Sequence, residues 1–353
     1  MSNKLSDPEF RKKIYQTLAD LLDVEASVVT QACQFSEQQI RLSFPFVFEQ
    51  RRNEIFVALQ ALGITQTEVQ CQSYIDPKQT KLKRVTNVKN IIAVASGKGG
   101  VGKSATSVNL AFALQAQGAK VGLLDADIYG PSIPIMLGNP QAHPQSEDNR
   151  HMIPLNCEGV VANSIGYLVP PENATIWRGP MASKALQQLV NETLWPELDY
   201  LIVDMPPGTG DIQLTLAQQI PITAAVIVTT PQDIALADAK KGIAMFNKVD
   251  VPVLGLVENM SYYLCSNCGH KDYVFASGGG QRLATEFGLP LLGQIPLDIV
   301  IREHADGGKP LLHQLPNSAL SLAYSDLAFN VSKQLALYSG LKRDDGIDVQ
   351  MSS

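Results

Sequence analysis

The chain has 353 residues, a hydrophobic content of 45% and a formal net charge of −6. This length allows two domains, or one large domain with an appendage. The acidic balance and the lack of a polybasic cluster argue against nucleic acid as a partner. The polar N-terminus carries no long apolar segment of a secretion signal, and no apolar run approaches the length that spans a membrane. We therefore expect a cytoplasmic protein that binds neither nucleic acid nor a membrane.

Five cysteines are an odd number in a chain without an export signal, so we expect no disulfide framework. Cys33, Cys71 and Cys157 have no potential ligand nearby at metal-binding spacing, which is typical of isolated buried thiols. Only Cys265 and Cys268 lie close together in the sequence.

The first 76 residues predict a small α+β domain. Asp7 is a suitable helix cap and Pro8 a suitable first helical residue. A polar and basic stretch after Asp76-Pro77 predicts a linker over residues 77–89. The expected elements are a helix over 8–22, a strand over 40–48, a helix over 53–62 and a strand over 66–74.

Residues 90–340 alternate apolar runs with helical stretches, which is typical of an α/β domain with a mostly parallel sheet covered by helices on both faces. A polar, proline-containing stretch over 138–154 predicts a surface loop, and a final helix over 318–338 is expected to dock on the domain. We expect a disordered tail over 341–353. The expected strands are 91–95, 121–125, 160–165, 200–204, 224–228, 253–257 and 291–295.

A glycine-rich turn separates the strand at 91–95 from the helix that follows. Gly97, Gly102, Lys103 and Ser104 satisfy the pattern G-x-x-x-x-G-K-S of a phosphate-binding loop. Such a loop turns backbone N–H groups onto phosphate oxygens, while its lysine adds a charge and its serine a hydroxyl for Mg²⁺. The expected nucleotide-binding residues of this loop are Gly97, Lys98, Gly99, Gly100, Val101, Gly102, Lys103, Ser104 and Ala105.

The same turn also satisfies G-x-G-x-x-G, the fingerprint of dinucleotide-binding folds, through Gly97, Gly99 and Gly102. Asp125 even lies at the distance expected of a ribose-binding acid. A nicotinamide enzyme, however, has no use for Lys103 and Ser104 at the helix start, so the phosphate-binding interpretation is favoured.

Three acidic residues follow the ends of predicted strands. Asp125 ends one strand, Asp127 follows it by two positions, and Asp204 ends another. Carboxylates at the carboxyl ends of parallel strands face the same edge as the phosphate loop, where they could bind Mg²⁺ and position an attacking water. An acid in this position can instead cap the next helix. We take Asp125 and Asp204, with Ser104, as candidate magnesium ligands.

The identity of the nucleotide base is predicted from the residues that follow two of the expected strands. Residues 247–250 spell N-K-V-D, the tetrad that reads guanine, but they precede a predicted strand instead of following one. Asn259 and Pro296 follow strands and could form the walls of a base pocket. Adenine, and therefore ATP, is the preferred interpretation.

Cys265-Ser266-Asn267-Cys268 is a C-x-x-C turn, which supplies two thiolates of a four-ligand metal site. A symmetric dimer that brings two such turns together would complete a four-thiolate site. A redox dithiol, a zinc site that uses His270 and a turn without metal are alternatives. Residues 261–264 and Gly269 predict that the turn is a hairpin loop.

These motifs together resemble the Mrp-type (ApbC-like) iron-sulfur cluster carriers, within the deviant-Walker group of P-loop ATPases. The resemblance covers residues 90–336 and rests on GKGGVGKS, LLDADIYGPSIP, WRGPM, LDYLIVDMPPGTGD, VPVLGLVENMSYYLC and CSNCGH. It implies that Lys98 reaches the nucleotide of a partner subunit, that Asp127 orients the hydrolytic water, and that paired C-x-x-C turns bridge a [4Fe-4S] cluster.

The resemblance is weaker in the N-terminal domain. Its α/β order is compatible with the fold of cluster-targeting factors, but the stretch FPFVFEQ has no cysteine after the central strand, which implies a reduced docking role.

The function expected from residues and resemblance together is that of a homodimeric ATPase with a catalytic set of Lys98, Lys103 and Asp127. It would carry a [4Fe-4S] cluster on Cys265 and Cys268 and exchange it with apo iron-sulfur proteins and a cluster assembly scaffold. The alternative is a positioning ATPase of the ParA/MinD type, which Lys98 fits equally well but which leaves the C-x-x-C turn unexplained.

Overall fold

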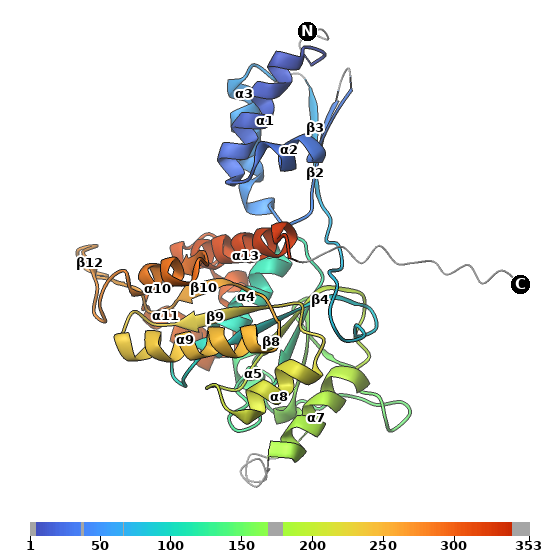
Figure 1. Ribbon diagram of the computed structural model, residues 1–353, viewed down its shortest axis with the longest axis vertical. Helices are drawn as coiled ribbons and strands as arrows, with labels where there is room; N and C mark the ends of the chain where they lie inside the picture. The colour runs from blue at the N-terminus through green and yellow to red at the C-terminus, as the bar shows by residue number, and fades with distance from the viewer. Residues whose placement is uncertain (1–4, 37–38, 66, 169–178, 341–353) are drawn as a thin grey trace, which may run out of the picture. The chain divides into compact units, whose positions relative to one another are not determined.

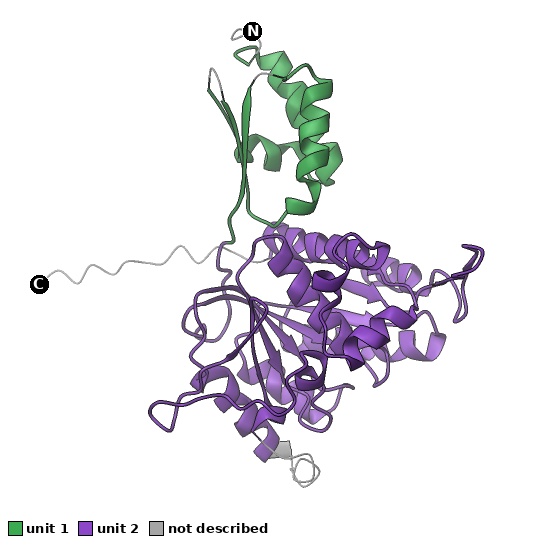
Figure 2. Ribbon diagram, turned by 180° about the vertical axis from the view of Figure 1, so that it is seen from behind, with its two compact units in different colours: residues 1–75 green, residues 76–353 purple. Residues whose placement is uncertain are grey.

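The computed structural model describes residues 5–36, 39–65, 67–168 and 179–340. The chain divides into two compact units, Met1–Ile75 and Asp76–Ser353 (Figure 2). Two sequence expectations fall on other residues: the disordered tail at 341–353 and the first two residues of the WRGPM motif.

The first unit packs three helices against a three-stranded sheet of order β1-β2-β3. Strands β1 and β2 pair antiparallel, whereas β2 and β3 pair parallel. Apolar side chains from the helices and from β2 form its core, including Ile14, Leu18, Ile40 and Leu42. The elements are α1 (Pro8–Leu22), α2 (Ala26–Ala32), β1 (Cys33–Phe35), β2 (Gln39–Phe44), η1 (Glu49–Arg51), α3 (Arg52–Ala61) and β3 (Glu68–Ser73).

Helix α1 has the predicted bounds, and Asp7 caps it by accepting a hydrogen bond from the Glu9 N–H. The strand expected over 40–48 ends earlier, at Phe44, because Pro45 has no N–H to continue the ladder. Phe46 and Phe48 beyond it are buried and pack their rings against Phe44. The apolar run therefore continues as core and not as strand.

The second unit is built on an eight-stranded sheet of order β13-β10-β9-β4-β8-β5-β7-β6. All neighbouring pairs are parallel except the edge pair of β6 and β7. Strand β6 is absent from the sequence expectation because its three residues carry no periodic signal. The strands are β4 (Val88–Ala95), β5 (Val121–Asp125), β6 (Leu155–Cys157), β7 (Val160–Ser164), β8 (Leu198–Asp204), β9 (Ala224–Thr229), β10 (Val253–Glu258) and β13 (Leu291–Gln294).

Helices cover both faces of this sheet, as expected (Figure 1). Alternate residues of the strands pack with α7, α8, α9 and α10 into one large apolar cluster. On the opposite face the Tyr200 hydroxyl of β8 lies 2.8 Å from the Ser332 hydroxyl of α13, which packs beside α4. The helices are α4 (Lys103–Ala116), α5 (Ile133–Met136), η2 (Ile165–Tyr167), α7 (Gly179–Glu192), α8 (Asp211–Gln219), α9 (Asp233–Lys248), α10 (Gly279–Phe287), α11 (Ile299–Asp306), α12 (Leu311–Gln314) and α13 (Ala319–Leu337).

The stretch at 77–89, expected as a linker, makes contacts within the second unit. The Lys78 ammonium donates a 2.7 Å hydrogen bond to the Ala336 carbonyl. Val85 is buried, and Val88 already belongs to β4. Because most residues of this stretch are polar, its composition did not indicate that Val85 and Val88 pack into the second unit. In the described part of the chain, no helix is both long and apolar enough to cross a membrane.

Candidate functional site

The glycine-rich turn connects the central strand β4 to the N-terminus of α4. Gly102 has φ 80° and precedes the first residue of α4, and a Cβ there would lie 2.0 Å from Asn259 Nδ2. A Cβ on Gly97 would lie 2.1 Å from the Asp238 carbonyl oxygen. A Cβ on Gly100, which has φ 79°, would instead meet open space. The Asp238 backbone and the Asn259 side chain thus leave no space for a Cβ at the two ends of the turn, while its middle leaves room for phosphate groups beside a helix N-terminus.

Lys103 and Asp204 form the centre of the site. The Lys103 ammonium lies 2.8 Å from Asp204 Oδ1 and 3.9 Å from Asp127 Oδ2. Asp204 ends β8, the strand next to β4, and its side chain is completely buried. A buried carboxylate needs such a partner because its charge has lost contact with water.

Two hydroxyl groups complete the surroundings of Asp204. The Ser104 hydroxyl donates a 2.6 Å hydrogen bond to Asp204 Oδ2, and the Ser107 hydroxyl donates a 2.7 Å bond to Oδ1. Ser104 and Asp204 therefore offer neighbouring oxygen atoms, which are the ligand type that Mg²⁺ prefers. Ser107 was missed in the sequence, although its place one helical turn after Lys103 is a usable signal.

Asp125 is the direct neighbour of Asp204 across the β5–β8 ladder. Its two carboxylate oxygens accept hydrogen bonds from Asp127 N, Ile133 N and the Ser164 hydroxyl, at 3.0–3.2 Å. Burial, with the nearby Asp204 charge as a second cause, raises the pKa of Asp125 to about 7. Through these contacts Asp125 holds the loop that carries Asp127, and its role as a magnesium ligand stays a prediction.

Asp127 lies in this loop at the same edge of the sheet. Its side chain is mostly buried, and burial raises the pKa of Asp127 while the Lys103 charge opposes that shift. A carboxylate with a raised pKa beside the phosphate loop is a suitable group to orient or deprotonate a water molecule.

Asn259 and Pro296 follow the neighbouring strands β10 and β13. Asn259 Nδ2 donates a 2.8 Å hydrogen bond to the Val101 carbonyl, so this amide contacts the phosphate loop directly. Pro296 is buried between Ile295 and Leu297, whose backbone atoms bond to residues after β10. The N-K-V-D tetrad lies at the C-terminus of α9 and before β10, at the opposite edge of the sheet.

Lys98 lies in the middle of the turn and is half-buried. The Ser96 hydroxyl donates a 2.8 Å hydrogen bond to the Lys98 carbonyl, which fixes the backbone there. Among the described residues, the Lys98 ammonium makes no ion pair.

The C-x-x-C turn forms the end of a projecting hairpin, as predicted (Figure 1). Strands β11 (Tyr263–Leu264) and β12 (Lys271–Asp272) pair antiparallel, and the Cys265 N–H donates to the His270 carbonyl. Cys268 is exposed, and Cys265 is partly exposed. Hydrogen bonds from the Cys268 and Asn267 backbone N–H groups lower the pKa of Cys265, which favours its metal-binding thiolate form.

This hairpin supplies two thiolates and no complete metal site by itself. Within the described ranges, no group of three or more His, Cys, Asp or Glu side chains is arranged to hold a metal ion. Among the described residues, the turn therefore offers half of the ligands of a four-ligand site.

A buried carboxylate, which the sequence reasoning missed, lies at the start of the segment that runs from the phosphate-loop contact to the hairpin. Glu258 ends β10 and is completely buried. It accepts hydrogen bonds from the Ser261 hydroxyl at 2.6 Å, from the Gln294 amide at 2.9 Å and from the Gly280 N–H. The following residue is Asn259, so five residues separate the phosphate-loop contact from Cys265. A charged residue at the end of an apolar strand was the available signal.

Comparison with known proteins places this site in context. A family model described as the NUBPL iron-transfer P-loop NTPase (ParA) matches residues 87–332. The chain is 64% identical over 260 residues to an iron-sulfur cluster carrier protein of Salmonella typhimurium, covering 72% of this chain and 70% of the relative. It is 48% identical over 275 residues to the mouse iron-sulfur cluster transfer protein NUBPL, covering 77% and 85%.

Among solved structures, the chain is similar to a nucleotide-binding protein of Archaeoglobus fulgidus in complex with ADP. The two share 37% identity with a TM-score of 0.58, and the match covers 64% of this chain and 89% of the other.

Proposed function

Since the chain belongs to the NUBPL iron-transfer P-loop NTPase family, we propose that it hydrolyses ATP and carries a [4Fe-4S] cluster bound between two copies of itself. It passes the cluster to apo iron-sulfur proteins in the cytoplasm, after receiving it from an assembly scaffold. The cluster is cargo, and ATP with Mg²⁺ is the nucleotide substrate.

One observation carries this proposal: the hairpin with Cys265 and Cys268 follows β10 at the edge of the sheet that also carries the phosphate loop. Asn259 contacts the loop at Val101, and Cys265 follows six residues later. Nucleotide state and thiolate position are therefore connected through a short, hydrogen-bonded stretch of backbone. A positioning ATPase has no use for this pair of thiols.

Pairing of two copies is supported by apolar side chains at the same edge. They follow the carboxyl ends of β5, β9 and β13, where an isolated chain would leave them in water. A two-fold axis at this edge would place two hairpins together and supply the four thiolates that a cubane cluster requires. The exposed apolar residues at this edge are Tyr129, Ile135, Ile234 and Ile299.

Within this proposal the polar residues have separate tasks. Lys103 binds phosphate oxygens, Ser104 and Asp204 provide oxygen ligands for Mg²⁺, and Asp127 orients the attacking water. Lys98 reaches the nucleotide of the partner copy, where its charge stabilises the transition state.

The cluster is tested by anaerobic reconstitution with iron and sulfide, followed by measurement of iron, sulfide and visible absorbance per dimer. The wild-type chain should turn brown, and the double variant Cys265→Ala/Cys268→Ala should stay colourless. Cys157→Ala is the matched control, because this buried thiol lies in the edge strand β6. A wild-type chain that binds only zinc would contradict the proposal.

Hydrolysis is tested separately with Lys98→Ala. We expect this variant to bind ADP as tightly as the wild type and to lose most of its turnover. Lys241→Ala, which removes an exposed lysine of α9, should leave turnover unchanged. Equal turnover in the Lys98 variant and the wild type would exclude the proposed role of this lysine.

A further inference from the structure

The segment that carries the two exposed cysteines is attached to the second unit by hydrogen bonds at its ends. Residues 262–278 are all exposed or partly exposed, and burial begins again at Gly279. In the part of the chain that the structure describes, the hydrogen bonds of residues 263–276 all stay within this stretch. Figure 1 shows the hairpin, labelled at β12, projecting away from the rest of the unit. The position of Cys265 and Cys268 therefore depends on how the two ends are fixed.

Both ends are bonded to one carboxylate, that of Glu258 at the end of β10. At the start of the segment, the Ser261 hydroxyl donates a 2.6 Å hydrogen bond to Glu258 Oε1. At its end, the Gly280 N–H in the first turn of α10 donates to Glu258 Oε2. The Gln294 amide of β13 donates to Oε1 at 2.9 Å and to the Ser261 hydroxyl at 3.1 Å. One side chain thus joins the two ends of residues 262–279.

The Glu258 carboxylate is held by donors alone. It is completely buried, and among the described residues no cationic side chain pairs with it. Its donors are a hydroxyl, an amide and the N-terminus of the nine-residue helix α10, whose dipole favours a negative charge. The fit is also close, because a Cβ on Gly280 would lie 2.8 Å from Glu258 Oε2. Movement of the carboxylate therefore releases at least one end of the segment.

The same strand end contacts the phosphate loop. Asn259 directly follows Glu258, and Asn259 Nδ2 donates a 2.8 Å hydrogen bond to the Val101 carbonyl. Met260, the next residue, has φ 54°, so the chain turns sharply between the loop contact and Ser261. A displacement of Asn259 by a nucleotide in the loop would thus act on the adjacent Glu258.

We propose that Glu258 is the positioning residue of the cysteine hairpin. Its carboxylate holds both ends of residues 262–279 and transmits a change at the phosphate loop to Cys265 and Cys268. Holding the two ends needs no nucleotide, whereas transmitting the change rests on the function proposed above. Glu258 acts through its hydrogen-bond partners and through the adjacent Asn259.

Hydrogen exchange of the full chain, measured by mass spectrometry without metal or nucleotide, tests how the ends are held. Glu258→Gln replaces one acceptor oxygen by an N–H donor, so it cannot accept hydrogen bonds at both ends. Exchange over residues 261–280 should become about tenfold faster, which corresponds to the loss of one hydrogen bond to a charged group.

Two serine variants complete this experiment. Ser261→Ala removes the bond at the first end only, so it should speed up exchange at the start of the segment. Ser321→Ala is the matched control, because it removes a buried hydroxyl that also donates a 2.6 Å hydrogen bond, but in α13. It should leave exchange over residues 261–280 unchanged.

Saturating ADP gives a readout that a merely structural role would not change. In the wild type, ADP should alter exchange over residues 261–280. In Glu258→Gln this response should be lost, although calorimetric titration still shows bound ADP. In Ser261→Ala the response should be reduced.

The proposal is overturned if both variants exchange like the wild type over residues 261–280, or if their faster exchange extends over the whole chain. It is also overturned if ADP has no effect on this segment in the wild type, or the same effect in Glu258→Gln. If Glu258→Gln does not fold, Ser261→Ala decides both parts. The measurement needs neither cluster nor hydrolysis, so a colourless reconstituted protein would contradict the proposed function and leave these results intact.

Discussion

The Lys103 ammonium lies 2.8 Å from the Asp204 carboxylate, and both side chains are almost completely buried. The pair joins the first residue of α4 to the last residue of β8. It therefore ties the phosphate loop to the strand beside it and places the lysine where phosphate groups would lie. Loss of either partner would leave the charge of the other buried without this ion pair, which destabilises the site.

Asp204→Asn should lower the free energy of unfolding by about 3 kcal/mol, because it leaves the Lys103 charge buried beside a neutral group. Asp238→Asn is the matched control, since the Lys241–Asp238 pair has a similar distance, 2.9 Å, but a lysine that is 66% exposed. That substitution should cost less than about 0.5 kcal/mol. Urea unfolding of both variants gives the comparison, and equal losses would show that burial of the Lys103–Asp204 pair has no effect on stability.

Gly102→Ala should abolish ADP binding and destabilise the fold. The new Cβ would lie 2.0 Å from Asn259 Nδ2, so Asn259 must release the Val101 carbonyl. Gly118→Ala is the control, because Gly118 also has positive φ, 92°, but open space around a Cβ. It should cost about 1 kcal/mol of backbone strain and leave ADP affinity intact. Thermal unfolding and calorimetric titration of ADP measure both effects, and normal ADP binding by the Gly102 variant would contradict this account.

Thiol labelling of the metal-free native chain should distinguish the hairpin from the other cysteines. Cys265 and Cys268 are accessible and should react first at mildly alkaline pH. Cys33 and Cys157 are buried, and burial raises the pKa of both thiols, so they should react only after unfolding. Mass spectrometry of the labelled protein identifies the sites. Rapid modification of Cys157 in the native chain would be inconsistent with its buried position.

Cys33 should contribute to the pH dependence of stability. Burial, followed by the neighbouring Cys71, raises the pKa of Cys33 from 9.0 to about 12. The native state then holds the thiol proton more tightly than the unfolded state. The contribution of Cys33 to the free energy of unfolding is therefore complete below pH 9 and decreases as the pH rises toward 12. The stability difference between wild type and Cys33→Ala should therefore narrow above pH 9. For Val29→Ala, a buried site without an ionisable group, the difference should stay constant.

The sequence determined the local features of this protein. The phosphate loop, the central strands and α1 follow from short-range patterns of glycine, apolar residues and caps, which act over a few residues. The hairpin at Cys265 and Cys268 was predicted for the same reason. The shorter elements α2, β1 and β6 were not predicted, because three to seven residues carry too little periodicity. Family membership was also predictable, since it rests on the order of these local motifs.

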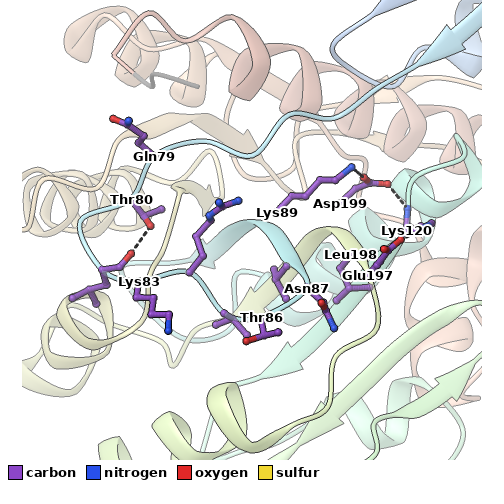
Figure 3. Close-up of a pocket in the computed structure, with 14 residues that line it drawn as sticks. Gln79, Thr80, Lys83, Thr86, Asn87, Lys89, Lys120, Glu197, Leu198 and Asp199 are labelled. Carbon is purple, nitrogen blue, oxygen red and sulfur yellow. Dashed lines mark hydrogen bonds and ion pairs between the residues drawn. The ribbon is translucent and has the colours of Figure 1, made fainter. Parts of the chain in front are cut away.

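Only the tertiary structure decided how the polar groups meet. The bond from Ser104 to Asp204 joins residues 100 positions apart, and the bond from Asn259 to Val101 joins residues 158 apart. Such partners depend on the order of strands in the sheet, which no local pattern specifies. The surroundings of Asp125 also depend on the tertiary structure. The β5–β8 ladder places Asp125 beside Asp204, and the loop after β5 supplies hydrogen-bond donors to its carboxylate. A cavity of about 840 Å³ at the edge of the sheet opposite the phosphate loop (Figure 3) likewise forms only when the starts of β4, β5 and β8 come together, because its lining comes from segments that are distant in the sequence.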